Sequence, residues 1–502
     1  MELSIKIDGL DCKYLENPQG SVSILELVDT EGTRENIEIP REIEGLLVTE
    51  IKDGAIMAHC AKTIFIPSSV EIIGDYAFSK CPAVEEYVVE EGSDFLESLD
   101  GDLYTKGLEK LIKVACGKEF EEFFVPEEVS EIGVCAFSHV KVPHIFAGEG
   151  VEKIGKGAFS YCESLSTIEL CDNVKEIGEK AFVGCPKLTK IGVSSNNPYY
   201  SDIDGVLYTK DQRTIICFPA SLKEIKLPSC VEKIEDYAFN CVIGLRKISL
   251  PRGLRRIGNN AFECCRNLTE VEIKGRIDYI GKNAFIDCKR LKSLTFLKGE
   301  TVIEEQAFKN CEKLEEIVLP EGLCKISNSM LQDCKALKKV AIPSTVKAIG
   351  SYAFGGCREL EALELPSDLI EIGEGAFGFS GLKEIEIPAG VKVIDKSTFC
   401  ICLKLEKIKL NEGLEKIGGA SFIGSGIKEI ELPKSVREIE SLAFIDCTNL
   451  KSVKIPKEVS IIGKEAFQLC HTELVICCEA EEKPEGWAQN WCGEHKARFK
   501  ND

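Results

Sequence analysis

The residues that come closest to a metal site lie near the C-terminus, and they are Cys477, Cys478, Cys492 and His495. Cys492 and His495 have a spacing that is common among zinc ligands, and a zinc site needs four sulfur or nitrogen donors. Cys477 and Cys478, however, continue the last strand-like run of the chain, and an atypical terminal cap accounts for these residues without a metal. We therefore predict no metal and no cofactor, with these four residues as the candidates to test.

No other pattern predicts catalysis. The segment 150–157 has the spacing of a phosphate-binding loop, but Gly157 stands where Ser or Thr must reach a magnesium ion. The 5 His residues show no pairing suited to acid–base chemistry, and the sequence lacks the Gly-x-Ser-x-Gly pattern of a nucleophile elbow. We therefore expect no catalytic residues and no enzyme.

A short repeat positions nearly all other side chains, and the segment 343–365 is its clearest copy. Phe262, Phe285 and Phe308 are 23 residues apart, and a fixed period of this length predicts a solenoid. Each repeat ends in alternating apolar residues that predict a strand. A proline then ends the strand, since it lacks an N–H group. The Ala-Phe pair after the Ile-Gly pair predicts a short helical turn.

Two insertions interrupt this period. Phe78 and Phe137 are 59 residues apart, and Phe182 and Phe239 are 57 residues apart. Each insertion contains a strand, an Asp-Gly turn and a second strand, so we predict two β-hairpins, near 90–124 and 194–222. Insertions in solenoids often form the binding edge. The candidate binding residues are therefore the tyrosines of the insertions, Tyr104, Tyr199, Tyr200 and Tyr208.

Many of the 25 cysteines recur at one repeat position. A free thiol is small and nearly apolar, so it tolerates burial. We predict a buried column of reduced thiols rather than disulfides. Its members are Cys60, Cys81, Cys162, Cys185, Cys265, Cys288, Cys311, Cys334, Cys357, Cys402, Cys447 and Cys470.

The domain organisation follows from the repeat. Residues 1–45 alternate like strands and lack the Phe and Cys columns, so they predict an N-terminal β cap. The solenoid then spans 46–478, and residues 479–502 predict a C-terminal cap with two Trp residues over the last coil.

Charge and hydropathy exclude two classes of partner. The 502 residues carry a formal net charge of -21, and nucleic acids and anionic membranes repel such a field. No run reaches the roughly 20 apolar residues of a membrane helix, and no signal-peptide pattern is present at the N-terminus. We therefore predict no nucleic-acid binding, no membrane insertion and a cytoplasmic location.

The consensus Leu-x-x-Ile-x-Ile/Leu-Pro-x-x-Val-x-x-Ile-Gly-x-x-Ala-Phe-x-x-Cys resembles the BspA-like (Treponema pallidum type) leucine-rich repeat, over about residues 40–478. The resemblance implies an α/β solenoid, a curved right-handed horseshoe of about 16 repeats of 22–23 residues. Its parallel sheet would be concave and its short helical turns convex. The resemblance also implies adhesion to host proteins or other cells from a secreted or surface location, which is the alternative to the cytoplasm.

The exposed strand positions of the last repeats alternate between acidic and basic residues, as in Glu384 and Glu386, Lys407 and Lys409, then Glu429 and Glu431. We expect these rows to form cross-strand ion pairs. A surface neutralised in this way, without aromatic or Arg anchors, is a poor binding hot spot.

The sequence thus predicts a monomeric, non-catalytic scaffold that binds another protein or a glycan. The alternatives are a structural spacer in an envelope assembly and an intracellular adaptor.

Overall fold

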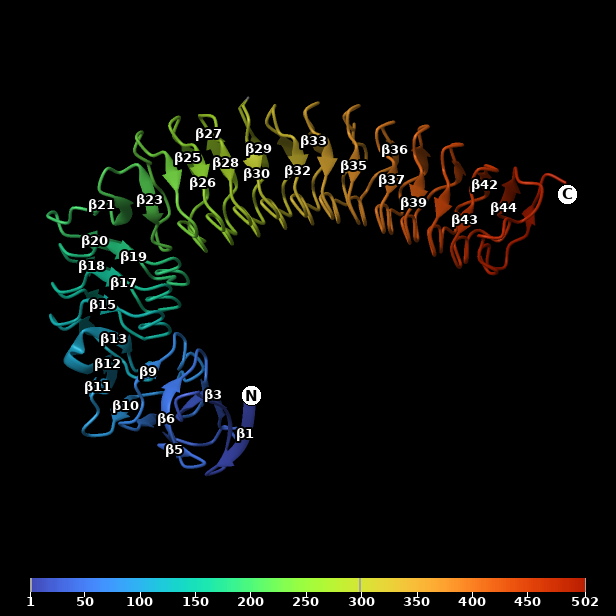
Figure 1. The fold of residues 1–502 in the computed structure, drawn as a ribbon. Coiled ribbons are helices and arrows are strands. Elements are labelled where there is room, and N and C mark those ends of the chain that lie inside the picture. Colours follow the sequence, from blue (N-terminus) through green and yellow to red (C-terminus); the bar gives the residue numbers. More distant parts are fainter. Residues whose placement is uncertain (1, 298, 502) are drawn as a thin grey trace. The chain divides into compact units, whose positions relative to one another are not determined.

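The computed structural model describes residues 2–297 and 299–501. It divides into two compact units. The first unit comprises the chain up to Leu222 together with Asp236–Val242, and the second comprises Lys223–Glu235 and the chain from Ile243 onward. Within each unit the chain winds in successive coils that lie side by side (Figure 1). This architecture confirms the predicted leucine-rich-repeat solenoid.

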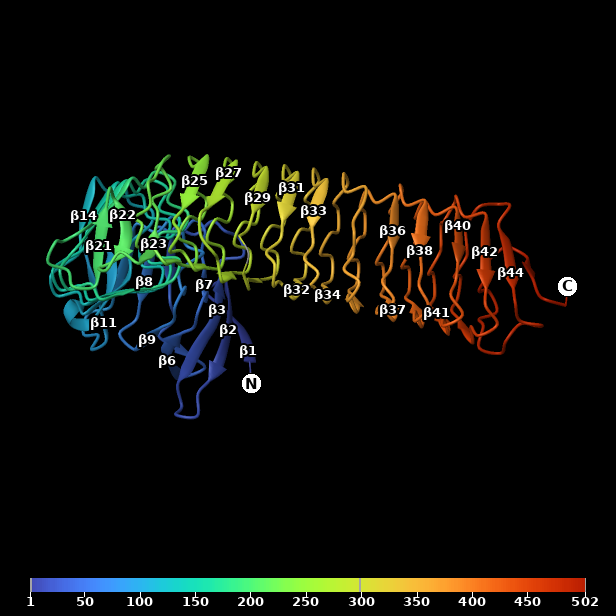
Figure 2. The same cartoon turned by 90° about the horizontal axis from the view of Figure 1, so that it is seen from above.

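The first unit begins with three antiparallel strands, β1 (Glu2–Ile7), β2 (Leu10–Glu16) and β3 (Val22–Val28). Apolar residues alternate with charged ones in β1 and β2, so each strand turns one face inward. Strand β3 then pairs in parallel with β6 (Leu46–Ile51) and β7 (Ile56–Met57). The antiparallel hairpins thereby continue directly into the first coil (Figure 2).

Two rows of parallel strands follow in this unit, one of longer strands and one of shorter strands. The longer strands are β4 (Asn36–Glu38), β8 (Thr63–Ile66), β10 (Glu86–Val89), β14 (Glu122–Phe124), β16 (His144–Phe146), β18 (Thr167–Leu170) and β20 (Lys190–Val193). The shorter strands are β9 (Ile72–Ile73), β15 (Glu131–Ile132), β17 (Lys153–Ile154) and β19 (Glu176–Ile177), and β5 (Glu42–Ile43) pairs with β6.

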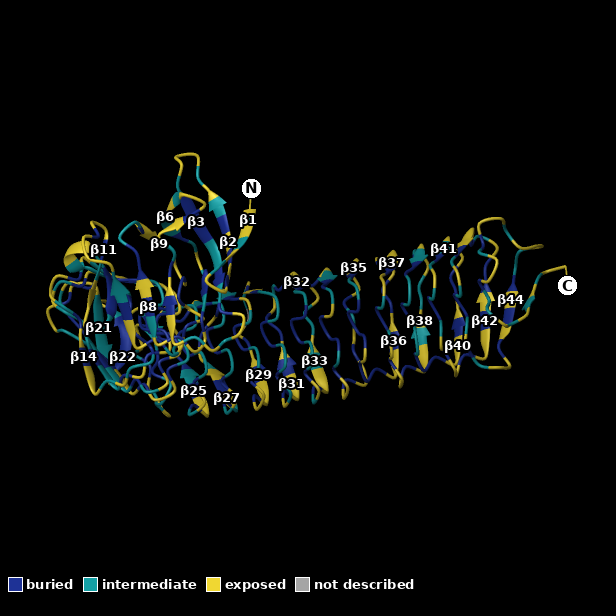
Figure 3. Cartoon of the chain, turned by 90° about the horizontal axis from the view of Figure 1, so that it is seen from below, coloured by how far each residue is buried: buried dark blue, intermediate teal, exposed yellow. Residues whose placement is uncertain are grey.

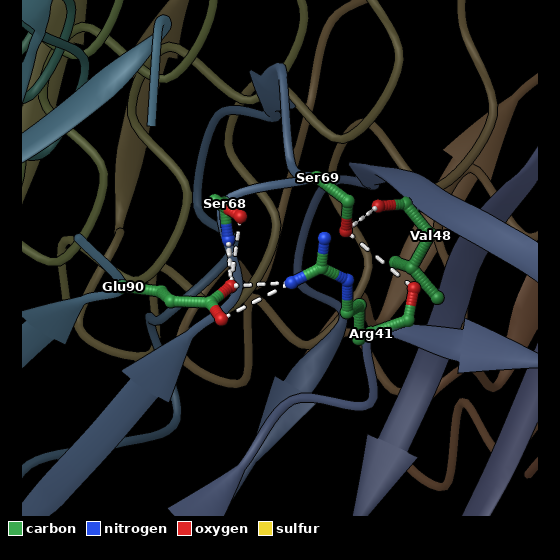
Figure 4. A network of polar contacts seen from close by, with 5 residues as sticks. All are labelled: Arg41, Val48, Ser68, Ser69 and Glu90. Atoms are coloured by element: carbon green, nitrogen blue, oxygen red, sulfur yellow. Dashed lines mark hydrogen bonds and ion pairs between the residues drawn. The ribbon is translucent and has the colours of Figure 1, made fainter. Parts of the chain in front are cut away.

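A polar network ties the first coils together (Figure 4). The Arg41 guanidinium lies 3.1 Å from the Glu90 carboxylate, and the Ser68 N–H and hydroxyl both donate to that carboxylate at 2.8 Å. The Ser69 hydroxyl donates to the Val48 carbonyl at 2.8 Å. These contacts join the strand β6 to the turns that follow β8 and β10, so they stabilise the register of the coils next to the cap.

The two predicted hairpin insertions are confirmed. The first contains β11 (Leu96–Leu99), β12 (Asp102–Thr105), a single 3₁₀ turn η1 (Lys106–Leu108) and β13 (Lys110–Lys113). The second contains β21 (Tyr200–Ile203), β22 (Val206–Thr209) and β23 (Thr214–Cys217). Strand β13 pairs in parallel with β15, so the third strand of the first insertion takes a place in the row of shorter strands.

The second unit repeats the same two rows, and its described residues contain no hairpin insertion (Figures 1 and 3). The longer strands are β25 (Lys247–Leu250), β27 (Glu270–Ile273), β29 (Ser293–Thr295), β31 (Glu316–Val318), β33 (Lys339–Ala341), β36 (Glu384–Glu386), β38 (Lys407–Lys409), β40 (Glu429–Glu431), β42 (Ser452–Ile455) and β44 (Val475–Cys478). The shorter strands are β24 (Lys233–Ile234), β26 (Arg256–Ile257), β28 (Tyr279–Ile280), β30 (Val302–Ile303), β32 (Lys325–Ile326), β34 (Ala348–Ile349), β35 (Glu371–Ile372), β37 (Val393–Ile394), β39 (Lys416–Ile417), β41 (Glu438–Ile439) and β43 (Ile461–Ile462). A final strand, β45 (Ala497–Arg498), pairs with β44.

The segments expected to be helical turns are β-turns instead. In the copy around Phe354, Tyr352 has φ 56° and Gly356 has φ 74°, and a residue with positive φ cannot continue an α-helix. The Ala353 N–H donates within the turn to Gly350, whereas the Phe354 N–H donates to Ala376 of the next coil at 2.8 Å. Hydrogen bonds between coils thus replace those of a helix, and the backbone groups of the turn remain paired.

The phenylalanines of the turns form the axis of the second unit. Phe422 stacks between Phe399 and Phe444, with ring centroids 5.4 Å and 5.0 Å away. The last ring of this column, Phe467, meets Trp491 edge to face at 5.9 Å. Trp487 and Trp491 are both buried at this end of the column.

All 25 cysteines are free thiols. Most thiols of the predicted column are buried, and they also act as hydrogen-bond donors: Cys288 Sγ donates to the Phe262 carbonyl of the preceding coil at 3.1 Å. Burial raises the pKa of several of these thiols, for example that of Cys81 to about 12, so those groups are held as unreactive thiols. Cys60 differs from the prediction, because it is exposed. Ile56 fills the Phe position of that coil, as its carbonyl accepts from Cys81 Sγ, and this displaces Cys60 from the column by one residue.

Candidate functional site

The four candidate tyrosines of the insertions differ in accessibility. Tyr104 in β12 and Tyr208 in β22 are 2% and 1% exposed. Both belong to the core, and burial raises the pKa of Tyr104. Tyr200 is half-buried and its hydroxyl donates to the Lys175 carbonyl at 3.3 Å. Tyr199 is 51% exposed, so it is the member of this set that a partner can contact.

Asn197, next to these tyrosines, is fully buried and orders the start of the second insertion. Its Nδ2 donates to the carbonyls of Cys171 and Val174, each at 2.9 Å. Its Oδ1 accepts the N–H groups of Tyr199 and Tyr200, each at 2.8 Å. Every hydrogen-bonding position of this side-chain amide is thereby used within the fold. Asn197 therefore positions the insertion.

The four C-terminal candidates for a metal do not converge. Cys477 is exposed, Cys478 is buried, and Cys492 and His495 are half-buried. The His495 N–H donates to the Cys492 carbonyl at 3.2 Å, so their spacing belongs to a tight turn. Burial raises the pKa of Cys492 and lowers that of His495. Within residues 2–297 and 299–501, no three His, Cys, Asp or Glu side chains form a group that could hold a metal ion.

A groove of about 1400 Å³ lies over the longer strands of the last coils of the second unit. It extends across β36, β38, β40, β42 and β44, which lie side by side in Figure 2. Leu363, Ile385 and Ile430 form an apolar floor that is less than a tenth exposed. Charged side chains from the alternate strand positions form the walls, because successive residues of a strand point to opposite faces.

The predicted charge pairing along this groove is only partly realised. Lys409 Nζ lies 2.7 Å from Glu386, and Lys454 Nζ lies 2.9 Å from Glu479. These ion pairs hold the pKa of Glu386 and of Glu479 below the ordinary value. Several other charged side chains of the groove have no group of opposite charge within 4.0 Å among the described residues. The charges without a close ion pair are Glu364, Glu384, Lys407, Glu429 and Glu431, and Glu431 faces Lys454 of the next strand and interacts with it only at longer range. The groove therefore exposes more free carboxylates than free ammonium groups.

The incomplete pairing has a structural cause. Strands β36 and β38 form one sheet, whereas β40, β42, β44 and β45 form another. The break lies between Lys407 and Glu429, which are 22 residues apart, where most neighbouring rows are 23 apart. The lysines of β38 therefore do not pair with the glutamates of β40.

No helix among the described residues has the length and apolar character to cross a membrane. The comparison with curated proteins found no match.

Three solved structures similar to this chain are leucine-rich repeat proteins. A leucine-rich repeat protein from Bacteroides ovatus ATCC 8483 is 24% identical, with 81% of this chain and 98% of that chain covered and a TM-score of 0.54. A leucine-rich cell surface protein from Faecalibacterium prausnitzii A2-165 is 22% identical, with 68% and 94% covered and a TM-score of 0.47. The T. pallidum leucine-rich repeat protein is 20% identical, with 51% and 90% covered and a TM-score of 0.22.

The model of the BspA-type leucine-rich repeat region matches in 6 copies, at residues 33–98, 115–203, 216–338, 279–405, 325–448 and 379–483. The residues left out between the first three copies, 99–114 and 204–215, lie in the two hairpin insertions. The repeat pattern, the coils and this match agree, and the chain belongs to the BspA-type leucine-rich repeat family.

Proposed function

We propose that this chain is a non-catalytic adhesion scaffold whose groove in the second unit binds a basic segment of a partner protein. Family membership supports the general role, since leucine-rich repeat proteins of this type serve as protein-interaction and adhesion scaffolds. The observation that carries the specific proposal is the excess of groove glutamates that have no ion pair within 4.0 Å among the described residues, which include Glu429 and Glu431. Opposite charge both steers a partner to such a surface and selects against acidic partners.

The dimensions of the groove suit an extended segment. Neighbouring parallel strands lie about 4.8 Å apart, so five strands offer about 20 Å, the length of roughly six extended residues. The apolar floor between the charged rows can accept the aliphatic stems of Lys or Arg side chains while the carboxylates meet their charged ends. A glycan would instead need neutral hydrogen bonds, and its binding would depend little on salt.

The test uses octalysine and octaglutamate as probes with the purified full chain. We expect octalysine to bind and its affinity to fall steeply between 50 and 200 mM salt, because screening weakens exposed charge pairs. A Glu429→Lys/Glu431→Lys variant should bind at least tenfold more weakly.

The matched control is Glu481→Lys/Glu482→Lys, which changes the net charge equally at exposed residues outside the groove. It should bind octalysine like the parent chain. Equal losses of octalysine affinity in the two variants would mean that the net negative charge of the chain attracts the probe. The groove would then be rejected as the binding site.

We also propose an envelope location for this scaffold, with the cytoplasm as the alternative. Fractionation of native cells distinguishes the two, since a protein found only in the cytosolic fraction cannot act in adhesion. In that case the intracellular adaptor becomes the function to test with the same groove variants.

A further inference from the structure

A cavity of about 400 Å³ lies in the first unit beside the first hairpin insertion. Its lining includes the turn around Tyr76, the insertion strand β13, the turn from Gly133 to His139, and Ser160 and Tyr161 of the next turn. Its volume falls within the range of small-molecule sites, which are mostly apolar with a few placed polar groups. None of the sites described above includes this cavity.

Lys113 is the polar group built into the cavity wall. Lys113 is only 7% exposed. Its Nζ donates to the carbonyls of Cys135 and Ser138, each at 3.0 Å. An ammonium group has three N–H donors, so these two contacts leave one donor without an acceptor. No carboxylate lies within 4.0 Å of Lys113 in the part of the chain that the structure describes.

A buried cation without a counterion is costly, because it has lost its hydration without gaining an ion pair. The other cation of the cavity, Lys110, is already paired with Glu131 at 2.8 Å. Two acidic residues, Glu71 and Asp75, also line the cavity. Their negative charge disfavours a multiply charged anion such as phosphate, so a singly charged anion fits this site best.

The remaining walls suit an apolar or aromatic body. Tyr76 and Tyr161 contribute partly exposed rings, and the His139 ring stacks on Tyr161 with centroids 5.2 Å apart. Burial, and then the charge of Lys113, lower the pKa of His139, so this ring is neutral at pH 7. Ser138 and Ser160 add hydroxyl groups, 3.2 Å from each other.

We propose that the first unit binds a small organic carboxylate with an apolar or aromatic body, and that its carboxylate pairs with Lys113. The site exists because the insertion interrupts the stack between the turns of Phe78 and Phe137. The second insertion lacks this cation. Its Cys217 occupies the position of Lys113, as shown by the matching registers of Leu103 with Lys113 and Leu207 with Cys217.

The test compares two probes that differ in charge, 3-phenylpropanoate and its neutral amide, by calorimetry and by thermal unfolding of the full chain. We expect the acid to bind at one site per chain and to raise the melting temperature, since a ligand of the folded state stabilises it. The amide should bind at least tenfold more weakly, because hydrogen bonds to charged groups are about twice as strong as neutral ones.

Lys113→Met should bind the acid and the amide equally, whereas Lys210→Met, an exposed lysine of the second insertion, should behave like the parent chain. Tyr161→Ala should lower the affinity for both probes several-fold and should still bind the acid more tightly than the amide. If Lys113→Met does not fold, the ratio of the affinities for the acid and the amide, measured in the parent chain and in Tyr161→Ala, tests the proposal. Equal binding of the two probes by the parent chain, or an unchanged preference in folded Lys113→Met, overturns the proposal.

Discussion

The two units differ in what they bury. In the first unit, the buried polar side chains include two carboxylates, an ammonium group and an amide, from Asp29, Asp102, Lys113 and Asn197. In the described part of the second unit, the buried polar side chains are all hydroxyls, such as those of Thr398 and Ser421. The two units share the same coil, so the difference comes from the insertions and the cap.

An uninterrupted repeat fills its interior with identical neighbours. Within an unbroken run of the stack, a Phe such as Phe422 meets one ring on each side, and each turn hydrogen-bonds to the next. An insertion removes one turn from the stack and supplies a strand whose side chains do not match the column. The first insertion thereby brings Asp102 and Lys113 into the interior. Sensitivity to pH and to small ligands is therefore expected in the first unit, and stability from regular stacking in the second.

The largest expected effect tests the stacking. Phe422 has rings on both sides, whereas Phe182, at the second insertion, has among the described residues a ring neighbour only on the side of Phe159, at 5.4 Å. Truncation of a buried Phe costs roughly 3–5 kcal/mol. We expect Phe422→Ala to lower the free energy of unfolding by an amount near the upper end of this range, and Phe182→Ala by an amount near the lower end.

Urea unfolding can separate these effects because both Trp residues, Trp487 and Trp491, belong to the second unit. Tryptophan fluorescence then reports the second unit, and circular dichroism reports both. The exposed Leu403 provides a control, since Leu403→Ala should change the free energy of unfolding by no more than about 0.5 kcal/mol. Equal losses for Phe422→Ala and Phe182→Ala would contradict the difference between the units.

The next effect tests the buried carboxylate of the first insertion. Burial raises the pKa of Asp102 from its ordinary 3.8 to about 6, although its Oδ1 accepts the Ala115 N–H at 2.9 Å. The folded state therefore holds the proton more tightly than the unfolded state. Below about pH 4 the carboxyl is mostly neutral in the folded and the unfolded state, so it does not lower the free energy of unfolding. As the pH rises towards 6, ionisation destabilises the fold, by on the order of 2–3 kcal/mol once it is complete.

Asp102→Asn keeps the acceptor oxygen and removes this ionisation. We expect the variant to be more stable than the parent chain at pH 7 and to differ little from it at pH 4. The measurement is the free energy of unfolding by circular dichroism across this pH range. Asp94→Asn, at an exposed position of the same region, is the control and should leave the pH profile unchanged. A constant difference between Asp102→Asn and the parent chain at all pH values would refute the assignment.

The sequence was sufficient to predict the coil, because the residues that define it recur at a fixed period. One Phe, one Cys and one Ile-Gly pair per repeat determine which side chains point inward, and many copies average out local exceptions. The same reasoning was wrong about the helical turns. Helical spacing of Ala and Phe does not reveal that the residue before Ala, such as Tyr352, has positive φ. Neither does it show that the N–H groups bond to the next coil.

The sites could be predicted less well, because they depend on non-periodic residues. The tyrosines of the insertions attracted attention as aromatic side chains, yet Tyr104 and Tyr208 fill the core. Lys113 was not predicted, since an apolar run that contains one Lys is also typical of an ordinary strand. Comparison of the two insertions contains the signal that could have found it: the position that holds Lys113 in one holds Cys217 in the other.

The smallest expected effect tests the regular surface of the second unit. Lys409 and Lys407 project from the same strand, but only Lys409 has a carboxylate within 4.0 Å among the described residues, that of Glu386. An exposed ion pair contributes little, so Lys409→Met should lower the melting temperature by roughly 1–2 °C. Lys407→Met should change it less, because no close pair is lost. Raising the salt concentration should reduce the difference between the two variants, since it screens the Lys409 pair. Equal melting temperatures at low salt would show that even the paired row contributes nothing measurable, and that the second unit owes its stability to its interior alone.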